Sequence, residues 1–134
     1  MIIKYKIWNE SEQKMYNFEQ AKLNTKFFIK DFNIFAGLYL PTGNPKNHIL
    51  FYTGKSDYYG VEIYMNDLIM IPGNNRETIV GVVKFGEYYQ EDEIHIGFYV
   101  EFENKALKKS LGYWSNKCKN LGSIYTTKCN RVYE

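Results

Sequence analysis

The sequence has very little alanine, the strongest helix former, and many aromatic residues, which favour strands. Among its 134 residues alanine occurs only at Ala21, Ala36 and Ala106, whereas there are 13 Tyr and 9 Phe. Aromatic side chains are enriched in strands, so this balance predicts a mainly β chain. No apolar run is long enough to cross a membrane, and apolar and charged residues alternate near the N-terminus, unlike a secretory signal. We therefore expect a cytoplasmic protein with no membrane partner.

Residues that commonly build metal, redox and catalytic sites are also scarce. Cys118 and Cys129 lack the Cys-x-x-Cys spacing, and a reducing cytoplasm would keep both as thiols. His95 is far in sequence from the other histidine, His48, whereas a zinc site needs three or four ligands. No phosphate-binding glycine loop or nucleophile elbow is present. We therefore assign no catalytic residue, metal ligand or cofactor, and expect no familiar enzyme class.

The distribution of turn residues predicts two regions. Pro41, Gly43, Asn44 and Pro45 mark the clearest loop in the chain. We expect an N-terminal β-hairpin with irregular additions over residues 1–48 and the main β region over residues 49–134, with one continuous domain as the alternative. A chain of this length buries about two-thirds of its unfolded surface, enough for a core without metals or disulfides.

Short apolar or alternating segments separated by turn signals predict antiparallel strands. They suggest a bent sheet or a small SH3-like barrel, which would leave few free strand edges. One helical turn is expected at residues 19–24 and another at residues 105–109. The expected strands cover residues 2–8, 14–18, 27–29, 34–40, 49–52, 67–71, 78–85, 94–103 and 123–125.

The strand over residues 94–103 has the clearest alternation. Its apolar residues share one face and are expected to point inward, whereas His95 and the residues that alternate with them point outward. The inward set is Ile94, Ile96, Phe98, Val100 and Phe102.

The segment from Tyr52 to Asp67 carries the most specific motif. Asp57 and Gly60 indicate a turn, because Asp bonds nearby backbone and Gly accepts a positive φ. Asn66 is expected in the left-handed conformation before the next strand. The carboxylates Asp57, Glu62 and Asp67 are interpreted as turn and strand residues, with acid–base chemistry as the alternative. The motif residues are Tyr52, Thr53, Gly54, Asp57, Gly60, Glu62, Ile63, Tyr64 and Asp67.

This motif resembles the signature of the YopX family of phage and prophage proteins. Segments 3–8, 14–16, 81–85 and 121–125 match other parts of the family pattern in order, with Lys55 and Asn66 as departures. The resemblance implies a β-rich accessory protein, and the family has no established biochemical activity.

The charge changes sign near Asn104. Residues 86–104 contain six acidic residues and no Lys or Arg, whereas residues 105–133 contain seven basic residues and no acidic one. One interpretation is that the two blocks lie side by side and offset each other; the other is a surface for an acidic partner. The residues expected at a nucleic-acid or partner contact are Lys108, Lys109, Trp114, Lys117, Lys119 and Arg131.

Two functions follow from these observations. The first is a non-enzymatic interaction protein that self-associates, because the aromatic residues exceed what one small core needs. The alternative is a nucleic-acid-binding module of weak sequence preference, in which Trp114 stacks on bases beside the lysines. With Arg76 and Arg131 as the only arginines, bidentate reading of guanine is not expected.

Overall fold

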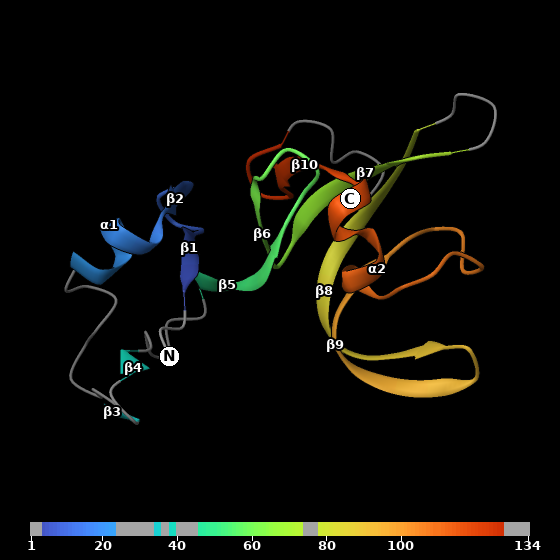
Figure 1. Cartoon of the computed structure of the whole chain (residues 1–134). Coiled ribbons are helices and arrows are strands. Elements are labelled where there is room, and N and C mark those ends of the chain that lie inside the picture. Colours follow the sequence, from blue (N-terminus) through green and yellow to red (C-terminus); the bar gives the residue numbers. More distant parts are fainter. Residues whose placement is uncertain (1–3, 24–33, 36–37, 40–45, 74–77, 128–134) are drawn as a thin grey trace. The chain divides into compact units, whose positions relative to one another are not determined.

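The computed structural model describes residues 4–23, 34–35, 38–39, 46–73 and 78–127, and these residues form a mainly β protein of antiparallel sheets, as predicted (Figure 1). The described elements are β1 (Tyr5–Asn9), β2 (Lys14–Tyr16), α1 (Phe18–Leu23), β3 (Ile34–Phe35), β4 (Leu38–Tyr39), β5 (Asn47–Ser56), β6 (Glu62–Tyr64), β7 (Asp67–Pro72), β8 (Thr78–Gln90), β9 (Glu93–Glu101), α2 (Leu111–Trp114), a 3₁₀ turn (Ser115–Lys117) and β10 (Lys119–Ser123). They divide into two compact units, Met1–Tyr52 and Thr53–Glu134. The predicted segment 27–29 lies outside the described residues.

The N-terminal unit is built on the predicted hairpin. β1 pairs with β2 on one side and with the first part of β5 on the other, so that Ile7 lies opposite both Tyr16 and Ile49. α1 begins after Asn17, whose side chain accepts the Gln20 N–H at 2.8 Å while the Gln20 side chain accepts the Asn17 N–H at 3.0 Å. This reciprocal cap fixes the start of the helix and lets it bury Ala21. The buried core of this unit is Tyr5, Ile7, Tyr16 and Ala21.

The second unit is a four-stranded sheet in the order β10-β7-β8-β9. Residues that share its inner face form one core with α2, because cross-strand partners such as Ile71 and Ile79 point the same way. Gly81 lies at the tightest point of this core: a Cβ there would stand 2.5 Å from Val100 Cγ1. The buried members of this core are Ile63, Ile69, Ile71, Val83, Val100, Phe102, Leu111 and Cys118.

The turns of the family motif have the predicted backbone. Gly60 has φ 83° and Asn66 has φ 63°, both in the left-handed region. The Thr53 hydroxyl donates to the Ile63 carbonyl at 2.7 Å and so ties β5 to β6.

In the N-terminal unit the predicted strand 34–40 is instead two short strands, β3 and β4, that pair with each other. In the second unit three predicted elements differ from the structure. Residues 105–109 form no helix; Asn104 caps a turn there, and the helix α2 begins at Leu111. The last described strand is Lys119–Ser123, whereas the prediction was 123–125. β8 continues to Gln90, five residues beyond the predicted end at Phe85. The two strand errors share a cause, because the length of β8 and the position of β10 are fixed by pairing partners distant in sequence.

Candidate interaction surface

The hairpin of β8 and β9 is the longest paired element of the chain. Glu91 and Asp92 connect the two strands with φ of 54° and 63°, the backbone of a two-residue type I′ turn. The register is unbroken from Gln90↔Glu93 to Val82↔Glu101. β7 pairs with β8 only as far as Leu68↔Val82, so the outer part of the hairpin is a two-stranded ribbon.

One face of this ribbon carries several exposed apolar side chains and one exposed carboxylate, Glu87, which is the cross-strand partner of Ile96. Phe85, Tyr89, Ile94 and Ile96 lie on the same side as the buried Val83–Val100 pair, and we call these four residues the hairpin face. Their exposed fractions are 54%, 64%, 59% and 72%. The Phe85 ring also packs edge-on against Phe98, with 4.9 Å between ring centroids.

The exposure of the hairpin face corrects one prediction. Ile94 and Ile96 were expected to point into the core with Val100 and Phe102, but only Val100 and Phe102 are buried. The alternation itself is right: Ile94, Ile96 and Val100 share one face of β9, and Phe102 follows directly after the strand. The strand continues past the elements that cover this face, so its outer apolar residues meet solvent.

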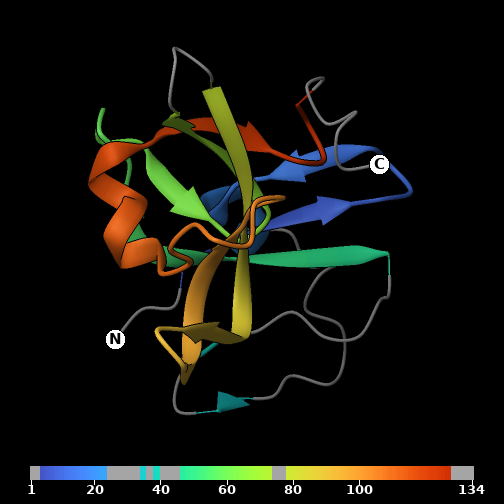
Figure 2. The same cartoon turned by 90° about the vertical axis from the view of Figure 1, so that its right-hand side faces the viewer.

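The opposite face of the ribbon curls back toward the loop that follows β9. The Gln90 side chain accepts the N–H groups of Lys109 and Ser110 at 2.9 and 3.0 Å. Ser110 pairs with Tyr99, six residues along β9 from the partner of Gln90, which is roughly 20 Å in a straight strand. A side chain cannot span that distance, so the ribbon must bend, and both views show it curving (Figures 1 and 2).

The bend coincides with a pair of glycines. Gly86 and Gly97 are direct cross-strand partners, and Gly86 has φ 151°. On that side of the ribbon Tyr88 meets Tyr99 at 5.2 Å and stacks on His95 at 5.3 Å between ring centroids. His95 therefore faces away from the hairpin face, as predicted, and its Nε2 lies 3.9 Å from Glu93.

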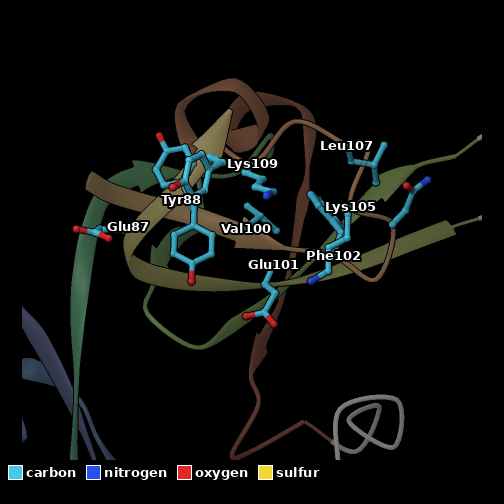
Figure 3. Close-up of a pocket in the computed structure, with 11 residues that line it drawn as sticks. Glu87, Tyr88, Val100, Glu101, Phe102, Lys105, Leu107 and Lys109 are labelled. Atoms are coloured by element: carbon cyan, nitrogen blue, oxygen red, sulfur yellow. The ribbon is translucent and has the colours of Figure 1, made fainter. Parts of the chain in front are cut away.

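A pocket of about 280 Å³ lies between β9 and the loop after it. Figure 3 shows Tyr88 on one side of this pocket and Phe102 with Lys105 on the other, while Glu87 points away from the other labelled side chains. Its lining includes acidic, basic and tyrosine side chains, so the two charge blocks meet here. Lys108 Nζ also lies 3.8 Å from Glu91. This contact supports the interpretation that the blocks offset each other.

The residues predicted for a nucleic-acid or partner contact are brought together only in part. Trp114 is half buried: it packs on the core, and its Nε1–H donates to the Lys108 carbonyl at 2.6 Å. Its neighbour Tyr113 is more exposed, with Lys108 Nζ and Lys117 Nζ 4.6 and 3.7 Å from its ring centroid. We call Lys108, Tyr113 and Lys117 the Tyr113 cluster. Lys109 lines the pocket, Lys119 is exposed on β10, and Arg131 lies outside the described residues.

Two carboxylates of the motif, Asp57 and Asp67, accept hydrogen bonds from the turns around them and from Asn120 on β10. Buried Asp57 accepts the N–H groups of Tyr59, Val61 and Asn120, each at 2.8 Å. Buried Asp67 accepts the Tyr64 N–H and the Asn120 side-chain amide at 2.8 and 2.9 Å. These bonds support the interpretation of Asp57 and Asp67 as turn residues. Asn120, which links both, was missed by the sequence analysis because its partners lie far away in the sequence.

Cys118 is a buried free thiol of the second core. Burial, with a smaller effect from the charge of Asp57, raises the pKa of this thiol to about 11. The thiolate that would react or bind metal is therefore disfavoured at neutral pH. Within the described ranges no three His, Cys, Asp or Glu side chains gather as a metal site, and no described helix is long and apolar enough to cross a membrane.

These features define a small β protein of two antiparallel units, whose long hairpin carries an exposed apolar face. The chain belongs to the YopX family, since the family model described as YopX protein matches residues 4–128. It is also similar to a solved structure, the crystal structure of protein EF1440 from Enterococcus faecalis, with 17% identity and a TM-score of 0.55 over 100% of this chain and 99% of that chain. At this identity the likeness shows the fold alone. No curated protein matches the chain.

Proposed function

We propose that this protein acts by protein–protein contact, without catalysis, and that it self-associates through the hairpin face. The observation that carries the proposal is the group of exposed apolar side chains that continues the buried core outward along β8 and β9. Exposed apolar groups of this kind are typical of interaction sites on soluble domains. The proposal further places the protein in the cytoplasm of a bacterium that carries phage or prophage genes, as its membership of the YopX family implies.

Light scattering after gel filtration at about 50 µM protein tests the proposal. The wild type is expected to elute as an oligomer, and Ile96→Lys is expected to weaken its association at least tenfold, which is about 1.4 kcal/mol. A lysine at this position brings a charge into the contact without disturbing the buried core, because Ile96 is 72% exposed.

Leu23→Lys is the matched control, since Leu23 is also an exposed apolar residue, at 83%, but lies at the end of α1. This variant should associate like the wild type. A wild-type monomer at this concentration, or equal effects of the two substitutions, would contradict the proposal.

The second candidate function is weak binding of single-stranded nucleic acid at the Tyr113 cluster. The supporting observation is that Tyr113 is partly exposed between two lysine side chains. Stacking on an aromatic ring beside positive charge is a common way to bind a single strand. Tyr113 takes the role that the sequence analysis gave to Trp114.

A further inference from the structure

The outer edge of β9 offers backbone groups for strand pairing. Gln90 and Glu93 close the two-residue turn as a hydrogen-bonded pair, and hydrogen-bonded and non-hydrogen-bonded pairs then alternate along the hairpin. The N–H and C=O groups of Ile94 and Ile96 therefore point away from β8. Val100 lies an even number of residues from Ile94 and Ile96 on the same strand, so its backbone groups should also point away from β8. Its N–H does so, because it donates to the Lys109 carbonyl at 2.7 Å.

This edge is uncovered next to the hairpin face. The loop after β9 meets the edge at Tyr99 and Val100, and in the part of the chain that the structure describes no strand pairs with this side of β9 between Glu93 and Gly97. Natural proteins protect free edges with charged side chains, proline or bulges, and this segment has one charged residue at its end, Glu93, but no lysine, proline or bulge. Ile94 and Ile96 thus present both backbone groups and exposed side chains.

We propose that the partner at this edge is a second copy of the chain, paired antiparallel through β9 about a two-fold axis at His95. This inference rests on the proposed self-association and adds its geometry. Ile94 of each copy would exchange backbone hydrogen bonds with Ile96 of the other. The isoleucines of both copies would then share one face and widen the hairpin face across the axis.

The charges favour a second copy in this orientation. Antiparallel pairing carries the acidic turn at Glu91 and Asp92 along the edge of the other copy, toward its loop with Lys108 and Lys109. In the register about His95, Asp92 would lie opposite Phe98 of the second copy, beside the segment that ends at Ser110. Parallel pairing would place acidic turn against acidic turn, which is unfavourable. Each copy therefore supplies both halves of a complementary contact, as a two-fold interface requires.

A disulfide across the proposed axis tests the register. In a Cys129→Ser background, His95→Cys would place two thiols in a non-hydrogen-bonded antiparallel pair, where Cα atoms are about 4.5 Å apart and a disulfide fits. We expect mild oxidation to link most of the protein into covalent dimers that a reductant separates.

Glu93→Cys in the same background is the control, because the two thiols would lie roughly 13 Å apart along the paired strands. It should give few covalent dimers. An oligomeric wild type in which His95→Cys links no better than Glu93→Cys would overturn the β9 pairing and leave self-association standing. A wild-type monomer at about 50 µM would overturn both proposals.

Ile96→Pro gives a second measurement. Proline removes the outward N–H of Ile96, which the hairpin itself does not use, so the strand can keep its pairing with β8. We expect a monomer by light scattering, whereas Ile96→Val, which keeps the N–H, stays associated. A dimer that persists in the proline variant would contradict the edge pairing.

Discussion

At the scale of single residues, Asp57 is a buried carboxylate that accepts several hydrogen bonds from the main chain. Its buried carboxylate binds three backbone N–H groups, two in the turn after β5 and one in β10. Asp57→Ala would leave these donors without their acceptor, at a cost of about 1–3 kcal/mol for each one that stays buried. We expect urea unfolding to show a loss of about 3 kcal/mol.

Lys55→Ala is the control for this prediction, because Lys55 belongs to the same motif but its side chain is exposed. Its unfolding free energy should stay within about 0.5 kcal/mol of the wild type. An Asp57→Ala variant as stable as Lys55→Ala would show that water replaces the carboxylate at no cost.

For single residues, the sequence predicted the backbone conformation correctly where neighbouring residues in the chain determine it. Gly60 and Asn66 have the predicted positive φ because a turn is set by the few residues that form it. Asn120 could not be found in this way. Its main-chain N–H reaches Asp57 and its side chain reaches Asp67, and both contacts exist only after β10 has joined the sheet.

At the scale of elements, the packing of β8 against β9 depends on the absence of a side chain at Gly81. A Cβ there would approach Val100 Cγ1 to 2.5 Å and the Phe102 ring to 2.7 Å, and both neighbours are buried. Overpacking of this kind costs about 1–3 kcal/mol, so Gly81→Ala should lower the thermal unfolding midpoint by several degrees. Gly97→Ala, where nothing lies within 4 Å of the added Cβ, is the comparison and should change it little. Equal midpoints would contradict the tight packing.

The strands show what alternation can and cannot predict. Alternation correctly placed Ile94, Ile96 and Val100 on one face of β9, because successive side chains point to opposite sides. It could not reveal how far along the strand that face is covered. The covering elements are distant in sequence, and they end before Ile96. The sequence therefore predicted which residues share this face of β9, but the prediction that Ile94 and Ile96 belong to the core was wrong.

At the scale of the whole molecule, the small formal net charge of +2 includes an acidic block at residues 86–104 and a basic block at residues 105–133. Lys108 is held beside Glu91, so part of the positive charge near Tyr113 is offset within the chain. The same arrangement supports the antiparallel pairing of two copies, in which acidic turns and basic loops meet. Self-association and nucleic-acid binding would then compete for Lys108, and a substitution at Glu91 separates them.

Glu91→Ala is expected to strengthen binding of single-stranded DNA, because it frees Lys108 from its carboxylate partner. Exposed pairs of this kind are worth about 0.2–1 kcal/mol, so the gain should be roughly twofold at low salt and should shrink as salt rises. Fluorescence anisotropy of a labelled oligonucleotide measures it. Glu19→Ala, which frees Lys22 on α1 in the same way, is the matched control and should leave binding near the wild-type value. If the wild type does not bind at about 50 mM salt, or if both variants bind more tightly to the same degree, the Tyr113 cluster is not a nucleic-acid site and the basic block serves contacts between proteins.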